Sequence, residues 1–310
     1  MKDAGILVWI FPVDAIISYV NGNDPIWLEA YKNEIGNAPD ITRFRDWGTL
    51  KYILRGIDKF MPFIDRVMLI VSSDSQVPGY INRDTVKIIK HEDFIPAKYL
   101  PTFNSNTIEL FIPKIEGLSD KFLYFNDDFF VVMPCTEEDF FIDGVPKINM
   151  QKIPDVNPGF KKICENSYNL ANLIVNGKKT SFKTPFVPQH TITPMIRSKC
   201  LEWLKNGYKT ITETISRERK QFNVCQYLYT DALFINGCFV NEPISFEMLR
   251  YCVDEFDYIL ETIKHPRTKT ICINEPQKQI DSDWDHDRLK ITEAFEILLP
   301  NKSKHENNSI

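Results

Sequence analysis

The sequence lacks the features that mark disulfide-rich, zinc-finger and membrane-spanning proteins. Its seven cysteines are odd in number, lie far apart and include no C-x-x-C pair. This pattern excludes a disulfide scaffold and a zinc knuckle, and it is typical of reduced thiols. The apolar run at 5–11 (GILVWIF) has only seven residues, too few to cross a bilayer, and no small-residue cleavage site follows it. We therefore expect 5–11 to form a buried first strand.

An excess of positive charge is also missing. Lys and Arg number 37 against 42 Asp and Glu, which gives a net charge of -5 and a pI of about 5.7. This balance excludes a nucleic acid as the main partner, although a local basic pocket can still hold a phosphate. Together with the reduced thiols, it predicts a cytoplasmic protein without stable membrane insertion. A peripheral contact with the inner face of the cell membrane stays open, as does the oligomeric state.

Alternating strand and helix patterns in the first half of the chain indicate the fold class. Residues 13–20, 66–73 and 85–93 are rich in β-branched residues, whereas 47–62 and 107–115 place apolar residues on one helical stripe. A further strand ends in the Asn-Asp-Asp triplet at 126–128. The order predicts an α/β fold: a Rossmann-like, mostly parallel sheet flanked by helices.

The second half of the chain has a different pattern. Pro, Gly, Asn and Lys are frequent in 137–186, which we expect to be an inserted lid segment. Beyond it, 195–206, 223–234, 245–263 and 286–299 read as a mainly helical C-terminal part. Residues 1–300 are expected to form a single catalytic domain, and 301–310 (NKSKHENNSI) a solvated tail.

The segment KFLYFNDDFFVV sets two adjacent carboxylates, Asp127 and Asp128, between apolar runs. Two buried and ionised carboxylates repel each other, so their burial requires protonation or a cation. A hard divalent ion, Mg²⁺ or Mn²⁺, would neutralise the carboxylates and could bind substrate phosphate oxygens at the same time. The alternative is a strand-to-loop turn with solvated carboxylates. The immediate return to apolar residues favours the metal site.

Other candidate residues lie near expected strand ends or in polar loops. In doubly wound sheets, ligands bind at the carboxyl ends of the strands. Asn21, Gly22 and Asp24 follow the strand at 13–20, where Gly22 permits close backbone approach, although a plain turn is the simpler interpretation. His190 lies between two prolines in VPQHTITP and could equally be structural.

Two short basic segments could bind phosphate. Guanidinium groups hold phosphate through paired hydrogen bonds. The alternative is that each basic segment is only a solvated helix end without a ligand. The first segment, RFRD, contains Arg43, Arg45 and Asp46, and the second, SRERKQ, contains Arg217, Arg219 and Lys220.

The order of these segments resembles the Stealth family. The resemblance rests on DAIISYVNGNDPIWL, RFRDWGTLKYILRGIDKFMPFIDRVMLIV, LPTFNSNTIELFIPKIEGLSDKFLYFNDDFF, VPQHTITPMI and TICINE, and it covers about 13–300. That family comprises bacterial capsular polysaccharide phosphotransferases and the catalytic part of animal GlcNAc-1-phosphotransferase. It implies a GT-A-like fold and a hexose-1-phosphate transferase. Such an enzyme moves a sugar 1-phosphate from a UDP-sugar, such as UDP-GlcNAc, to a hydroxyl of a saccharide acceptor. The products are a phosphodiester and UMP, in capsular or cell-surface polysaccharide synthesis.

The resemblance also implies roles for residues. Asp128 with Asn274, and Asp127 as a further candidate, would hold the metal on the diphosphate. Arg217, or Arg219 in the other register, would stabilise the transferring phosphoryl group, and His190 would act as general base. The nucleotide-sugar pocket would be lined by Asp14, Asn21, Gly22, Asp24, Arg45 and Asp46. The last family block usually reads Asn-Asp, whereas this chain has Asn274-Glu275, which puts a metal contact by the acidic residue in doubt.

Two other functions fit the same residues. A metal-dependent glycosyltransferase would also use a UDP-sugar, but it would release UDP. A non-enzymatic sugar-binding module would use the Asn-Asp-Asp triplet only as a loop.

Overall fold

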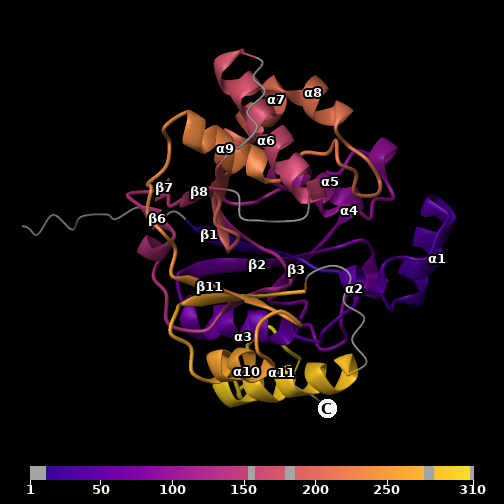
Figure 1. The fold of residues 1–310 in the computed structure, drawn as a ribbon, viewed down its shortest axis with the longest axis vertical. Helices are drawn as coiled ribbons and strands as arrows, with labels where there is room; N and C mark the ends of the chain where they lie inside the picture. The colour runs from indigo at the N-terminus through magenta and orange to yellow at the C-terminus, as the bar shows by residue number, and fades with distance from the viewer. Residues whose placement is uncertain (1–11, 153–157, 179–185, 276–282, 308–310) are drawn as a thin grey trace, which may run out of the picture.

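A computed structural model describes residues 12–152, 158–178, 186–275 and 283–307 of the 310-residue chain (Figure 1). The strand expected at 5–11 lies outside the described residues. No helix within the described ranges is long and apolar enough to cross a bilayer.

A five-stranded sheet forms the centre of the molecule, in the order β10-β4-β1-β2-β3. Strands β1 (Val13–Ser18), β2 (Ile64–Val71), β3 (Val86–Lys90) and β4 (Lys121–Phe125) are parallel, and β10 (Thr193–Ile196) runs antiparallel beside β4. The prediction of an α/β fold with a mostly parallel sheet is therefore confirmed. The carboxyl ends of β1 and β4, which are neighbours, meet at the same edge.

Helix α3 (Leu50–Phe60) covers one face of this sheet, and its buried stripe is the one the sequence predicts. Helix α5 (Ser105–Phe111) and the 3₁₀ turn at Ile112–Lys114 pack on the opposite face. Pro113 lies in that 3₁₀ turn, because proline cannot donate the hydrogen bond that would continue the α-helix. Helix α1 (Pro25–Ile35) and the short helices α2 (Ile41–Phe44) and α4 (His91–Phe94) lie in the connections between the strands.

A second sheet has three strands in the order β11-β12-β5. Strand β11 (Phe246–Arg250) is parallel to β12 (Thr270–Asn274), and β5 (Phe129–Val131) is antiparallel to it. The expected helix at 245–263 is therefore wrong in its first part, because pairing with β12 overrides the local helical pattern. Helix α10 begins only at Phe256 and ends at Lys264.

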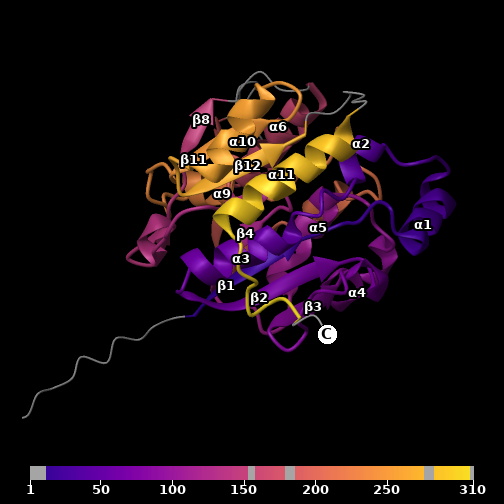
Figure 2. The same cartoon turned by 90° about the horizontal axis from the view of Figure 1, so that it is seen from below.

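Helix α11 (Trp284–Leu298) packs with α10 and α3 around the second sheet (Figure 2). Phe295 of α11 lies 4.6 Å from the ring of Phe130 and stacks on Tyr52 of α3 at 4.9 Å, measured between ring centroids. The described core is thus continuous from α3 through β5 to α11.

The segment 137–186 is largely folded where it is described. It contains the 3₁₀ turn Glu137–Asp139, then β6 (Phe141–Ile142), β7 (Val145–Pro146), β8 (Met150–Lys152) and α6 (Pro158–Asn176). Helix α6 packs against α9 (Tyr227–Ile235), and its Leu170 and Ala171 are buried in the same hydrophobic cluster as Phe122 and Tyr124 of β4. That 137–186 acts as a lid stays a prediction.

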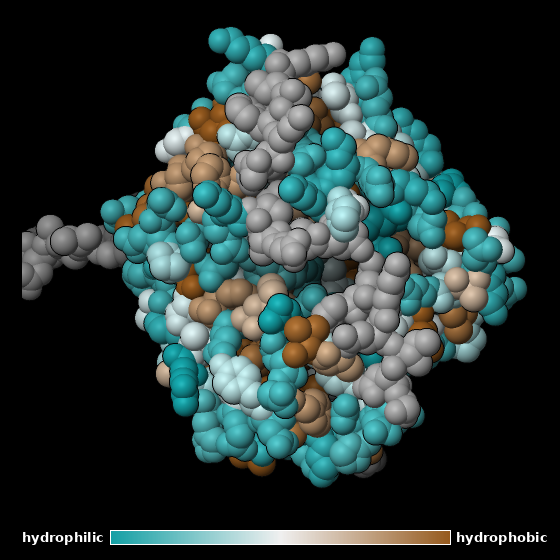
Figure 3. All heavy atoms as spheres, in the orientation of Figure 1, coloured by the Kyte–Doolittle hydropathy of each residue, from teal (hydrophilic) through white to brown (hydrophobic). Residues whose placement is uncertain are grey.

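The remaining elements complete the layer that lies above the strands in Figure 1. They are β9 (Phe186–Pro188), α7 (Arg197–Asn206) and α8 (Tyr208–Glu213). On this face of the molecule hydrophobic residues are scattered in small groups among hydrophilic ones (Figure 3).

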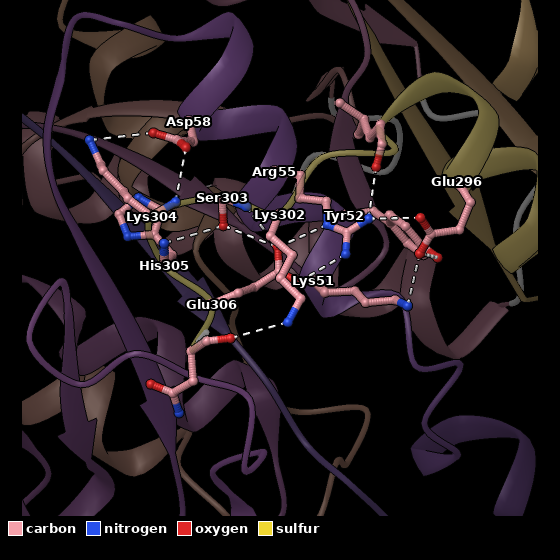
Figure 4. A network of polar contacts seen from close by, with 12 residues as sticks. Lys51, Tyr52, Arg55, Asp58, Glu296, Lys302, Ser303, Lys304, His305 and Glu306 are labelled. Carbon is pink, nitrogen blue, oxygen red and sulfur yellow. Dashed lines mark hydrogen bonds and ion pairs between the residues drawn. The ribbon is translucent and has the colours of Figure 1, made fainter. Parts of the chain in front are cut away.

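The expectation of a solvated tail is wrong for residues 301–307. Ser303, His305 and Glu306 are buried, and Glu306 accepts hydrogen bonds from Arg55 Nε at 2.8 Å and Arg55 Nη2 at 3.0 Å (Figure 4). Local polarity misled the prediction, because the charges of this segment are neutralised by a helix far away in the sequence. Residues 308–310 lie outside the described part.

Candidate functional site

Asp127 and Asp128 lie in the turn that connects β4 of the first sheet to β5 of the second. The pair is therefore in a turn, not in an extended strand. The apolar residues that follow are explained by β5, whose three residues are all buried. Asp127 is exposed and Asp128 is half-buried, so the two carboxylates have different surroundings.

Asp128 contacts two side chains from the end of β12. Its Oδ2 accepts hydrogen bonds from Cys272 Sγ and from Asn274 Nδ2, both at 3.3 Å. Cys272 and Asn274 share a face because side chains alternate along a strand. The other oxygen, Oδ1, is buried and has no hydrogen-bond partner among the described residues. A buried carboxylate oxygen without a donor is suited to a cation.

His190 lies beside this group, just before β10. Its Nδ1 is 3.2 Å from the Tyr227 hydroxyl, and its ring packs edge-on against Phe129 with centroids 5.0 Å apart. A ligand atom of His190 lies within 4.8 Å of those of Asp128 and Cys272. Burial, with the charge of Arg219, lowers the pKa of His190 although Asp128 opposes the shift. The imidazole is therefore neutral at neutral pH and able to accept a proton.

Although Asp127 is exposed, partial desolvation together with the charges of Asp128 and Asp46 raises the pKa of its carboxyl group above the usual range. A cation between these carboxylates would relieve their repulsion and return the group to the ionised form.

The two candidate arginines have different positions. Arg219 donates from Nη2 to Ser105 Oγ at 2.6 Å, and its Nε is buried without a hydrogen-bond partner. Arg217 instead forms an ion pair with Glu34 of α1, with 37% of its side chain exposed. Only Arg219 is among the charges that shift the pKa of His190. The structure therefore brings Arg219, rather than Arg217, to the group around His190.

Arg43 also lies near Arg219. Burial and the charge of Arg219 lower the pKa of Arg43 to about 10. Its guanidinium packs over the ring of Phe44 at 5.5 Å. Two neighbouring guanidinium groups with few acceptors form a positive region suited to an anion.

Asn21, Gly22 and Asp24 brace the loop that follows β1. A Cβ atom added at Gly22 would lie 2.3 Å from the carbonyl oxygen of Phe44, so the close approach is to α2 of this chain. Asp24 caps α1 and accepts hydrogen bonds from Ser75 at 2.6 Å and Gln76 Nε2 at 2.8 Å. The Asn21 backbone N–H donates to the Gln76 side chain at 2.7 Å. These contacts hold the loop beside the end of β1.

Asp46 and Arg45 lie close together in sequence but have different partners. Tyr19, directly after β1, donates to Asp46 Oδ2 at 2.9 Å. Arg45 Nε donates to Glu275 Oε2 at 2.9 Å, Arg45 Nη2 pairs with Glu275 Oε1, and Trp47 Nε1 donates to Oε2 at 3.1 Å. Glu275 is thus engaged by a buried arginine, while its neighbour in sequence, Asn274, faces Asp128.

Asp14 is not brought to this group. It lies at the amino end of β1, whereas Asp128 follows the carboxyl end of the parallel strand β4. Its buried carboxylate accepts from Arg66 Nε at 3.0 Å, Arg66 Nη2 at 2.7 Å and the Ser119 backbone N–H at 2.7 Å. The location and these bonds give Asp14 a structural role.

Sequence reasoning missed Cys272, Tyr227 and Tyr19, and it named Arg43 only as part of a segment that could bind phosphate. Cys272 could have been found, because it is two residues before Asn274 on a strand and therefore faces the same way. No local signal marks Tyr227, which reaches His190 from α9.

Comparison with known proteins places the chain in a family. Residues 43–148 match the family model described as Stealth protein CR2, conserved region 2. The chain is 32% identical over 226 residues to the receptor polysaccharide phosphotransferase WefC of Streptococcus oralis, covering 69% of this chain and 63% of that protein. It is 27% identical over 332 residues to the exopolysaccharide phosphotransferase cps2G of Lactiplantibacillus plantarum, covering 96% of each. The chain belongs to the Stealth family.

A further relative of this Stealth protein is the capsular polysaccharide phosphotransferase WcwK of Streptococcus pneumoniae. The identity is 27% over 331 residues, covering 95% of this chain and 98% of that protein. The matched Stealth region contains Arg43, Arg45, Asp46, Asp127 and Asp128, whereas His190 and Asn274 come from outside it. The site is therefore assembled from the matched region and from later parts of the chain.

Proposed function

We propose that this protein transfers a sugar 1-phosphate from a UDP-sugar to a hydroxyl of a saccharide acceptor and releases UMP. The reaction would serve capsular or cell-surface polysaccharide synthesis. The proposal is supported by the three relatives described above, which are named polysaccharide phosphotransferases. UDP-GlcNAc is one donor of the required class. A cytoplasmic location is part of the proposal, and the seven cysteines form no disulfide within the described part of the chain, as a reducing compartment favours.

The observation that carries the proposal is the buried, unpartnered Oδ1 of Asp128 beside Asn274 and His190. Mg²⁺ or Mn²⁺ would be held by Asp128 and Asn274, with Asp127 as a further ligand, since carboxylate and amide oxygens suit a hard cation. When bound, the cation would neutralise the diphosphate and stabilise the leaving UMP. Asn274 fits this role, because its amide group contacts Asp128 and its side-chain oxygen is of the kind that a hard cation binds.

His190 would act on the acceptor. If the Nδ1–H donates to the Tyr227 oxygen, the lone pair of Nε2 is free to accept the hydroxyl proton. As this proton moves to Nε2, the acceptor oxygen bonds to phosphorus and the bond from phosphorus to the UMP oxygen breaks. The lowered pKa of His190 keeps the ring in the accepting form at neutral pH.

Arg219 would stabilise the charge on the transferring phosphoryl group. Its unpartnered Nε and its influence on His190 support this choice over Arg217, which is ion-paired with Glu34. Arg43 would add a second positive charge to the same region. Positive groups of this kind lower the cost of charge on the phosphoryl oxygens.

The test is the nucleotide product of an incubation with UDP-sugars, a saccharide acceptor and Mg²⁺. We expect UMP, and we expect Asp128→Asn to lower its release at least about 100-fold, the usual loss when one electrostatic contact to the reacting group is removed. Asp120→Asn is the matched control, because Asp120 precedes the opposite end of β4 and its carboxylate accepts a hydrogen bond only from the Ser198 backbone N–H among the described residues.

Other products would identify the alternatives. UDP would indicate glycosyl transfer. Mg²⁺-independent sugar binding without any nucleotide product would indicate a binding module, and full UMP release by Asp128→Asn would reject the metal assignment.

A further inference from the structure

Three side chains of different chemistry meet at the candidate site. Asp128 comes from the turn after β4, His190 from the loop before β10, and Cys272 from β12. Their ligand atoms all lie within 4.8 Å of one another. A carboxylate, an imidazole and a thiol from three separate elements thus converge, and the proposed transfer reaction uses Asp128 and His190 but gives the Cys272 thiol no role.

Each of these three side chains has an atom that can bind a metal ion. The Oδ1 atom of Asp128 is buried and has no hydrogen-bond partner. His190 is oriented through Nδ1 by Tyr227, so its Nε2 is left for a ligand. Metal-bound histidines are commonly fixed through the other ring nitrogen in this way. The Cys272 thiol is buried and already directed at Asp128, to which it donates at 3.3 Å.

The ligand set differs from one suited to Mg²⁺. Mg²⁺ prefers oxygen, whereas sulfur, nitrogen and oxygen ligands together suit Zn²⁺, which commonly takes three protein ligands and one open position. Ligand atoms around tetrahedral Zn²⁺ lie about 3.5 Å apart, given zinc–ligand distances of about 2.0–2.3 Å. Adjustments on the order of 1 Å would therefore close this group around the ion.

We propose that Asp128, His190 and Cys272 form a site for a thiophilic divalent cation, Zn²⁺ above all, that excludes Mg²⁺ from Asp128. Binding forms a zinc–sulfur bond and releases the thiol proton to solvent, without a redox change. Because it occupies both Asp128 and His190, the ion inhibits transfer. The inhibition rests on the proposed function, but the binding does not.

Binding is measured without substrates by titrating the metal-free full chain with Co²⁺, which replaces Zn²⁺ and absorbs when bound to thiolate. The exposed Cys252 is first replaced by Ser so that its thiol does not contribute. In this Cys252→Ser background we expect one equivalent of Co²⁺ to give a thiolate-to-cobalt band that Zn²⁺ abolishes. Cys272→Ser should remove the band and weaken Zn²⁺ at least about 10-fold.

The matched control is Cys200→Ser, which removes another fully buried thiol, on α7. It should keep the band. A band that survives in Cys272→Ser, or no thiolate band in the background protein, would overturn the site. If Cys272→Ser does not fold, His190→Gln serves instead, and it should shift the band and weaken Zn²⁺ by a similar factor.

Zn²⁺ is then added to the UMP assay at saturating Mg²⁺. Inhibition that is at least about 10-fold weaker in Cys272→Ser supports the competition, and equal inhibition of both proteins contradicts it. A thiolate band in a protein that releases no UMP would support the cation site and reject the proposed function. The two failures are thus distinguishable.

Discussion

Replacing Glu306 by Ala tests whether the C-terminal segment is part of the fold. Its carboxylate receives two hydrogen bonds from Arg55 and one from the Ser303 backbone N–H at 2.9 Å, and the Arg55 and Glu306 side chains are only 6% and 4% exposed. Removing one partner of a buried pair leaves the other charge poorly compensated, which costs about 3–5 kcal/mol, and the carboxylate that Arg55 would keep, that of Glu296, is partly exposed to solvent. We expect Glu306→Ala to lower the free energy of unfolding by this amount.

The chain offers a matched control on the same arginine. Arg55 Nη1 also donates to Glu296 Oε2 at 3.0 Å, but the Glu296 side chain is 40% exposed. Solvent screens that pair, so the loss of this ion pair in Glu296→Ala should lower the free energy of unfolding by about 1 kcal/mol or less. Figure 4 shows the two carboxylates on either side of Arg55.

The assay is urea unfolding of both variants and the wild type, followed by circular dichroism. A loss below about 1 kcal/mol in Glu306→Ala, equal to that of Glu296→Ala, would refute the reasoning. It would mean that the segment 301–307 detaches in solution and that Arg55 is hydrated.

Three further predictions concern other parts of the molecule. Arg219→Lys should reduce kcat for UMP release about 10-fold or more, because the point charge of lysine does not replace the paired hydrogen bonds of the guanidinium. Arg217→Lys should change kcat less than about 3-fold. Equal effects of the two substitutions would contradict the assignment of Arg219 to the phosphoryl group. Gly22→Ala should raise the KM for the UDP-sugar, because the added Cβ would lie 2.3 Å from the carbonyl oxygen of Phe44 and would force that backbone to move. An unchanged KM and melting temperature would show that the loop adapts freely. Burial lowers the pKa of His91 to about 4 from the usual 6.5, so the unfolded state binds more protons between these values. The free energy of unfolding should therefore fall by about 3 kcal/mol as the pH falls from 6.5 to 4, because protonation of His91 favours the unfolded state. His91→Gln should reduce this pH dependence, as measured by urea unfolding.

The first half of the fold was largely predictable from the sequence. Strands β1, β2 and β4 each contain an uninterrupted apolar stretch because both faces of a parallel sheet are covered, and α3 shows a clear helical stripe. Strand β11 was not predictable, because its sequence, FEMLR, is equally compatible with a helix and only pairing with β12 decides.

The site was predictable where its residues follow strands. Asp128 and Asn274 meet because two sheets are joined by the turn at 126–128, and the resemblance to the Stealth family suggested the pair. The partners of Glu275 and Arg55 could not be read from the sequence, since each ion pair joins residues more than 200 positions apart. Such pairs depend on tertiary packing, which local patterns do not encode.

The most direct test of the central claim is the nucleotide released from a UDP-sugar in the presence of an acceptor and Mg²⁺. The account predicts UMP, lost in Asp128→Asn and in His190→Gln and retained in Asp120→Asn. Release of UDP, or undiminished UMP from both site variants, would contradict it.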